Sequence, residues 1–126
     1  MSELRRIVHV ESGETLVERA RWCDTFTSKL RGFTLRRELA TGEGLVLVEN
    51  RESRLNTAIH MLFVFFSLGV LWVDGDGRVV DSVVAQPWRL SYTPQAPARY
   101  VIEGHPQIID HIAIGDHVRF IEISGG

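Results

Sequence analysis

The chain has 126 residues, of which 44% are hydrophobic and 24% charged, and its formal net charge at pH 7 is −2. This length suits one globular domain, residues 1–126, with a single buried core. Proteins that bind nucleic acids usually carry an excess of basic residues, and this chain has none overall. We therefore expect no nucleic-acid partner.

The beginning of the chain shows no targeting signal. In MSELRRIVHV the charged residues are followed by an alternating pattern, whereas a signal peptide has a continuous apolar stretch and a small-residue cleavage site. The single cysteine, Cys23, has no partner for an internal disulfide. Together these features predict a reducing, cytoplasmic location.

Short strands and one short helix are expected in the first third of the chain. Residues 6–10 and 16–22 read as two strands around a Ser-Gly-Glu turn, which predicts an opening hairpin. Apolar residues then recur at helical spacing from Phe26 to Phe33, after Asp24, whose side chain suits the N-cap of a helix. One stripe of this helix is expected to face the core.

The middle of the chain is its most apolar part. Residues 44–48, GLVLV, predict a buried strand, and the polar residues 49–56 predict a loop. The run 58–73, AIHMLFVFFSLGVLWV, contains only two polar side chains, His60 and Ser67. A membrane-spanning helix needs about 20 apolar residues, and this run is shorter and rich in Val and Phe. We therefore expect a buried strand, a bend at Ser67 to Gly69 and a second strand, and no membrane contact.

The last third continues as strands separated by turns. The Asp-Gly-Asp-Gly sequence at 74–77 predicts a hairpin into a strand at 78–84. Three prolines then enforce an extended connection, and strands are expected at 99–103 and 117–123, with a helical turn at 107–112 between them. The overall pattern predicts a mainly β (α+β) fold, a single compact antiparallel β-barrel or sandwich-like domain with one or two short helices.

Several short motifs follow one another along most of the chain. They are Arg31-Gly32-Phe33 with Arg36, Gly44-Leu45, Ile59-His60-Met61, Val70 to Asp74 with Gly77, Tyr100 to Glu103, and Ile114-Gly115-Asp116. Their order and spacing resemble the family of domain of unknown function 192 (DUF192), roughly over residues 16–123. The resemblance implies a compact, mostly β domain of bacteria and archaea with no established activity, cofactor or substrate. A Pro and an Asp that are usual in the family near Ser67 and Gly69 are absent here.

Three residues are candidates for a ligand-binding site. The imidazole of His60 can bind an anion, donate to a ligand or transfer a proton, although a core histidine bonded to a backbone carbonyl is the alternative. Arg31 and Arg36 are its best partners by type, because guanidinium groups bind carboxylates or phosphates at two points. The resemblance places both in a family motif. Alternatively, they tie the helix to the sheet by pairing with Glu38 or Glu43.

No catalytic residue, metal site or cofactor is expected. The chain contains no GxSxG or SxxK motif, and its other histidines show no HExxH spacing and no cysteine at ligand spacing. Cys23 has no sequence neighbour that would activate it as a nucleophile, so a small buried hydrophobe is its expected role.

Three functions remain open. The first is a noncatalytic binding or accessory domain that presents a small cleft near His60 to an anionic ligand or a protein partner. The second is a hydrolase-type enzyme with His60 as base, which requires a nucleophile or activated water within reach of the imidazole. The third is an interaction module with an apolar dimer surface, unless Trp88 and Tyr92 cover that surface, so both a monomer and a homodimer are compatible with the sequence.

Overall fold

Strands dominate the computed structural model, which describes residues 3–25, 28–29, 32–33, 36 and 38–123. The elements are β1 (Leu4–His9), β2 (Thr15–Cys23), β3 (Glu43–Ser53), β4 (Leu68–Val73), β5 (Val79–Ala85), β6 (Ala98–Gly104), the 3-10 helix η1 (Pro106–His111) and β7 (Val118–Ile123). The mainly β fold class predicted from the sequence is confirmed. No helix in these described ranges is long and apolar enough to cross a bilayer.

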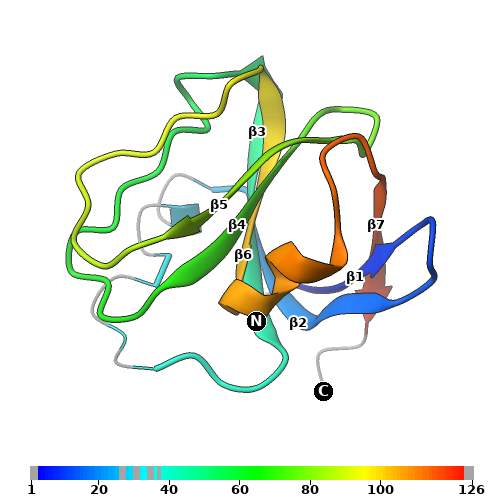
Figure 1. Cartoon of the computed structure of the whole chain (residues 1–126), viewed down its shortest axis with the longest axis horizontal. Helices are drawn as coiled ribbons and strands as arrows, with labels where there is room; N and C mark the ends of the chain where they lie inside the picture. The colour runs from blue at the N-terminus through cyan, green and yellow to red at the C-terminus, as the bar shows by residue number, and fades with distance from the viewer. Residues whose placement is uncertain (1–2, 26–27, 30–31, 34–35, 37, 124–126) are drawn as a thin grey trace.

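The seven strands form one curled sheet in the order β5-β4-β6-β3-β2-β1-β7, as Figure 1 shows. β2 and β3 run parallel, and every other neighbouring pair is antiparallel. The two outermost strands approach each other where Arg78 forms an antiparallel bridge with His117. The amide of Val79 donates to the carbonyl of Asp116 at 2.8 Å, and the amide of Val118 donates to the carbonyl of Gly77 at 2.8 Å. The sheet is therefore a half-barrel that is joined at one end.

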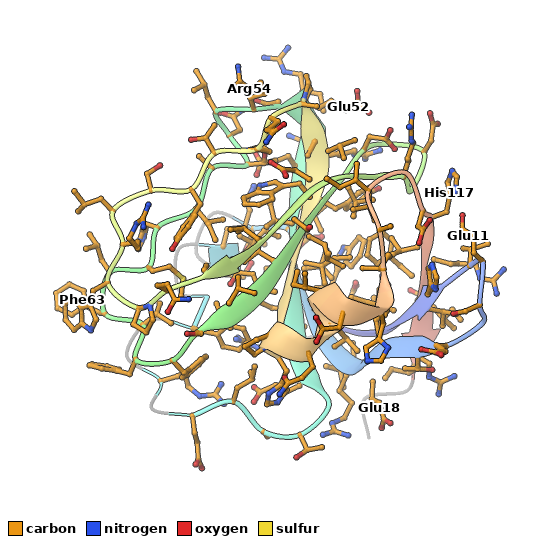
Figure 2. The ribbon with its side chains drawn as sticks, viewed as in Figure 1. Glu11, Glu18, Glu52, Arg54, Phe63 and His117 are labelled. Atoms are coloured by element: carbon orange, nitrogen blue, oxygen red, sulfur yellow. The ribbon has the colours of Figure 1, made fainter. Side chains whose placement is uncertain are left out.

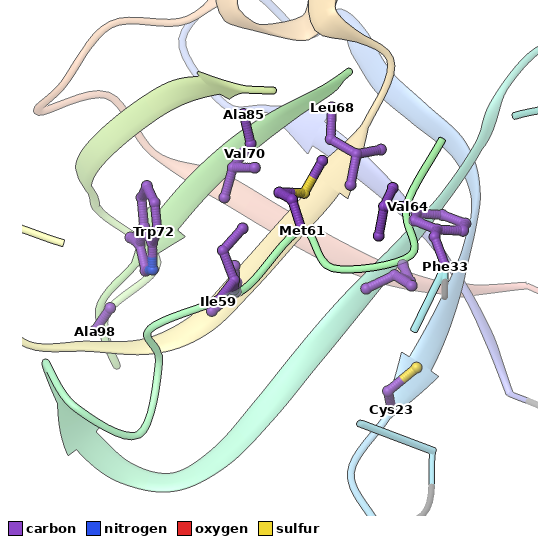
Figure 3. Packing of buried hydrophobic residues seen from close by; sticks show 12 residues of the cluster. Cys23, Phe33, Ile59, Met61, Val64, Leu68, Val70, Trp72, Ala85 and Ala98 are labelled. Atoms are coloured by element: carbon purple, nitrogen blue, oxygen red, sulfur yellow. The ribbon is translucent and has the colours of Figure 1, made fainter. Parts of the chain in front are cut away.

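Successive side chains of a strand point to opposite faces of a sheet. In the central strands both sets of side chains are apolar, and each face carries a hydrophobic core. Every residue of β4 is buried as a result. The inner core lies on the concave face and takes residues from both ends of the sheet and from η1: Ile7, Val17, Ala20, Val46, Leu71, Val73, Val79, Ile102, Ile108 and Val118. The outer core, partly shown in Figure 3, lies on the convex face: Cys23, Phe33, Leu45, Ile59, Met61, Val64, Leu68, Val70, Trp72, Ala85, Ala98 and Val101.

The prediction of a strand at the start of the apolar run 58–73 is wrong. Residues 58–67 form an irregular segment, in which Ile59 makes an isolated bridge with Tyr92, and β4 begins at Leu68. Phe63 has a φ of 60°, a left-handed conformation that a strand does not contain. Part of the segment packs against the outer core, and two of its aromatic residues, Phe63 and Phe65, are exposed. Its apolar composition therefore does not mean that both of its faces lie inside a sheet.

The proline-rich connection supports this covering segment. The amide of Trp88 donates to the carbonyl of Met61 at 2.7 Å, and Ile59 and Tyr92 exchange backbone hydrogen bonds of 2.9 and 2.8 Å. The Trp88 ring lies 5.0 Å from the ring of Phe63 and 5.6 Å from that of Phe65, centroid to centroid. Tyr92 thus packs against the outer core, as one sequence alternative proposed, whereas Trp88 is exposed and contacts the exposed rings of Phe63 and Phe65.

β3 is longer than predicted, and the helical turn has a different N-terminal cap. β3 extends to Ser53, so part of the predicted loop 49–56 is strand; backbone pairing of Ser53 with Ala98 outweighs the polarity of these exposed residues. The N-terminal cap of the short helical turn is Thr25 and not Asp24, because Thr25 and Ser28 exchange amide-to-hydroxyl hydrogen bonds of 3.1 Å in both directions. Phe33 is buried as predicted; Phe26 and Leu30 lie outside the described residues.

Gly69 allows η1 to pack directly on β4. A Cβ atom at this position would lie 2.6 Å from the carbonyl oxygen of His105 and 2.8 Å from Cγ1 of Ile108. We expect Gly69→Ala to lower the free energy of unfolding by about 1–3 kcal/mol, because the backbone at His105 has to move. Urea unfolding measures this loss. Gly75→Ala is the control, since its Cβ would meet only the flexible end of Glu52 at 3.4 Å; equal losses in the two variants would contradict the prediction.

Candidate functional site

A cleft opens on the convex face of the sheet, and His60 lies on its wall. It consists of an inner chamber of about 100 Å³ and an outer chamber of about 310 Å³. Lys29, Leu47, Ala58 and His60 line both chambers, so the two form one continuous site. We call it the His60 cleft. One of its walls is the irregular segment 58–67, which the sequence analysis had placed inside the sheet.

His60 is exposed and is not a core histidine. Its Nδ1 atom accepts a hydrogen bond of 3.2 Å from the amide of Leu62. This bond selects the neutral tautomer that carries its proton on Nε2, which leaves an N–H group to donate to a ligand. Among the residues that the structure describes, no serine, threonine or cysteine side chain is hydrogen-bonded to the ring.

Lys29 lies at the boundary of the two chambers, but its charge is already paired. Its ammonium group donates to the carbonyl of Val48 at 3.2 Å and forms an ion pair with the carboxylate of Glu49. Lys29 does not stand out in the sequence as a site residue, because its helical position predicts a solvent-facing side chain. Only the approach of the helical turn to β3 brings it to the cleft.

Glu103 forms the polar floor of the inner chamber. It lies on β6, in register with Leu45 on β3 and Val70 on β4, and both of these neighbours belong to the outer core. Its residue exposure is 7%, and no hydrogen bond to its carboxyl group is found in the described part of the chain. Burial raises the pKa of Glu103 to about 7, and the positive charge of Arg21 opposes this rise only in part.

Arg21 lies in the same row across the sheet, because it is paired with Leu45 from the other side. One of its terminal nitrogens, Nη2, donates to the carbonyl of Gly32 at 3.0 Å, and its guanidinium carbon lies 5.6 Å from the ring centroid of Phe33. Its Nε atom is buried and has no hydrogen-bond partner among the described residues. Arg21 is therefore held beside Phe33 and is not among the residues that line the chamber.

Arg36, one of the two arginines predicted to bind a ligand, is not among the residues that line the cleft. Arg36 forms a two-point ion pair with Glu43, with distances of 3.0 and 2.9 Å, and its guanidinium carbon lies 5.8 Å from the ring of Phe33. This is the tethering role that the sequence analysis gave as the alternative. Arg31 lies outside the described residues. A ligand-binding role for either arginine stays a prediction.

A second polar cluster joins the β1–β2 turn to the start of β7. Nε2 of His9 lies 2.8 Å from Oδ2 of Asp116, and Nδ1 of His117 lies 2.8 Å from Oε2 of Glu11; Figure 2 shows the last two side chains together. Hydrogen bonds from the backbone and side chain of His117 lower the pKa of Glu11 to about 2. The ligand atoms of His9, Glu11 and Asp116 lie within 4.8 Å of one another, a spacing that a metal ion can use. Each atom already has a hydrogen-bond partner, so we assign no metal here.

The DUF192 sequence profile, described as "Uncharacterized ACR", matches residues 7–120. The chain belongs to the DUF192 family. A UPF0127 protein of Thermococcus kodakarensis is 38% identical to it over 98 residues, which are 78% of this DUF192 chain and 60% of that relative. The chain therefore spans less than two thirds of the length of that relative. A UPF0127 protein of Thermococcus sibiricus is 34% identical over 114 residues, covering 89% of the chain and 72% of the relative.

Two solved structures share the fold of this DUF192 chain. A protein from Sinorhizobium meliloti 1021 aligns with a TM-score of 0.78 and 18% identity, covering 95% of the chain and 94% of that protein. A protein of unknown function from Novosphingobium aromaticivorans aligns with a TM-score of 0.70 and 20% identity, covering 92% and 83%. At these identities the likeness concerns the fold alone. The relatives are uncharacterised, so the function has to be argued from the cleft.

Proposed function

We propose that this DUF192 chain is a noncatalytic binding domain that holds a small ligand in the His60 cleft. The observation that supports the proposal is the cleft itself, since its outer chamber of about 310 Å³ has the size at which small-molecule sites begin. Its surface combines apolar side chains with a few polar groups at the edge and floor, which is the usual composition of such sites. A cytoplasmic location, inferred from the single cysteine, is part of the same proposal.

The contacts of His60 argue against a hydrolase. A base needs a nucleophile or an activated water within hydrogen-bond reach, and the described residues place only the amide of Leu62 on the imidazole. The raised pKa of Glu103 is the one observation that favours an enzyme, because a carboxyl group with a pKa of about 7 can act as acid or base at neutral pH. Turnover of chromogenic esters or phosphoesters that disappears in Glu103→Gln would replace our proposal with this second function.

A thermal-shift screen with phosphates, carboxylates, sugars and amines tests the binding function. We expect at least one class to raise the melting midpoint of the parent protein and of His111→Ala, a control on η1 at a distance from the cleft. Ala58→Leu fills the space shared by both chambers and is expected to abolish the shift. His60→Ala removes one donor and is expected to weaken binding about five-fold.

The screen includes anions because the sequence predicts an anionic ligand. If none of the four classes moves the midpoint of the parent protein, the cleft is not a small-molecule site. A shift that persists unchanged in Ala58→Leu would place the ligand elsewhere on the protein and would equally contradict the proposal.

A further inference from the structure

We propose that the His60 cleft selects small organic cations, which place a protonated primary amine on the carboxylate of Glu103 at the floor of the inner chamber. This inference rests on the proposed binding function and names its ligand class. It differs from the anionic ligand predicted from the arginine motif.

The Glu103 side chain lies in the chamber without a partner of its own. It is more than nine-tenths buried, it lines the inner chamber, and the described residues provide no hydrogen bond to its carboxyl group. Phe33, Met61 and Val64 contribute apolar surface to the same chamber. The Glu103 oxygens are open to the chamber, since Nε of Arg21 is the one fully buried polar side-chain atom without a partner among the described residues. An unpaired carboxyl group at this depth is still costly, because polar groups inside proteins are nearly always paired. A ligand that carries a donor supplies the partner that the protein lacks.

The balance of charge around the chamber also favours a cation. Lys29 is neutralised by Glu49, and Arg21 is held by Gly32 and Phe33 without forming an ion pair with Glu103. Among the described lining residues, the one fixed charge left without a partner is therefore the carboxylate of Glu103. The complement of an unpaired carboxylate is a cation, whereas an anion in the same chamber would be repelled.

The volumes of the two chambers limit the size of the ligand. The inner chamber of about 100 Å³ corresponds to roughly three water molecules at about 30 Å³ each, which is room for an aminomethyl group. The outer chamber of about 310 Å³ is lined on its apolar side by Leu47, Ala58 and Val101, which suit a short alkyl chain or a single aromatic ring. The ligand class is accordingly a primary amine with a small apolar body.

This arrangement predicts how affinity depends on pH. The carboxyl group of Glu103 binds a cation only when it is ionised, and its pKa in the free protein is about 7. Affinity is therefore expected to rise as pH increases through about 7 and to fall again near pH 10, where a primary amine loses its proton. The other charged or titratable groups around this region are Lys29, Glu49 and His60, which line the cleft, and Arg21, whose positive charge acts on Glu103.

The experiment compares three compounds with the same carbon skeleton: n-butylamine, n-butanol and butanoate. Titrations followed by amide chemical shifts detect weak binding, and we expect n-butylamine to bind at least ten-fold more tightly than the other two at pH 8. At pH 5.5 this preference is expected to disappear. Glu103→Gln is expected to lose the preference for the amine while still binding n-butanol, and Glu18→Gln, an exposed glutamate on β2, is the matched control.

The outcomes separate the two proposals. If n-butanol or butanoate binds in the cleft as tightly as n-butylamine at pH 8, the cation inference is wrong and the binding function stands. If the amine preference is unchanged at pH 5.5, Glu103 is not its partner, and this holds even if the glutamine variant does not fold. If none of the three compounds shifts any cleft amide, the amine inference is overturned, and the broader screen decides the binding function separately.

Discussion

Replacing Trp72 with alanine is expected to lower the free energy of unfolding by about 3–5 kcal/mol, which is a large part of the stability of a typical domain. Trp72 is 1% exposed and lies on β4 in the outer core. Its Nε1–H group donates to the carbonyl of Thr57 at 2.7 Å. The variant thus loses packing on the convex face together with the bond that fixes one end of the cleft wall.

Trp72→Phe separates the two contributions. Phenylalanine retains most of the apolar contact but leaves the carbonyl of Thr57 without its donor, at a cost of about 1–3 kcal/mol. Trp88→Ala is the control, since Trp88 is 48% exposed and buries much less surface. Urea unfolding followed by far-UV circular dichroism gives all three values. Equal losses for Trp72→Ala and Trp88→Ala would show that the outer core does not depend on Trp72 as the structure indicates.

The second large effect is the pH dependence that Glu103 imposes on stability. Its pKa is about 7 in the folded protein and near 4.5 when the chain is unfolded. Below pH 4.5 the carboxyl group is protonated in both states, so its contribution to stability is fully present. As the pH rises from 4.5 to 7, the unfolded chain releases the proton and the folded protein retains it, which lowers the free energy of unfolding by about 3 kcal/mol.

Glu103→Gln removes this dependence, because the amide does not ionise. We compare the free energy of unfolding of Glu103→Gln with that of the parent protein at each pH. Between pH 4.5 and pH 8 this difference is expected to shift by about 3 kcal/mol in favour of the variant. Urea unfolding of both proteins at the two pH values measures the difference, and Glu18→Gln shows what an exposed glutamate contributes. Glu11, whose pKa is lowered from 4.5 to about 2 in the folded protein, changes stability mainly below pH 4.5, and it does so equally in the parent protein and the variant, so it does not obscure the difference. Parallel pH profiles for the parent and Glu103→Gln would mean that the carboxyl group is solvated.

The sequence was sufficient to predict the turns and most of the strands, because glycine, proline and aspartate mark chain reversals through local geometry. It failed at residues 58–67, where apolar density reports burial but not backbone direction. What decides the conformation there is contact with distant residues: the bridge between Ile59 and Tyr92 and the hydrogen bond from Trp72 to Thr57. The parallel pairing of β2 and β3 also has no local signature, since both strands read alike in either orientation.

The residues that line the candidate cleft could be predicted only in part, for the same reason. His60 stands out as a polar residue in an apolar run, and the structure places it on the cleft wall. Glu103 was missed because an acidic residue at the end of a strand normally faces water, and only the register with Leu45 and Val70 puts it inside. A carboxylate on a strand that has a neighbouring strand on each side would have identified Glu103. This observation requires the strand order, which the sequence does not provide.

The bridge between Arg78 and His117 also bears on edge-to-edge association between copies of this chain. The edge of a sheet presents unpaired N–H and C=O groups on which a neighbouring molecule can add a strand. Here the two outermost strands, β5 and β7, use part of those groups on each other. The curl that encloses the inner core therefore also removes, at this end of the sheet, a template for edge-to-edge aggregation.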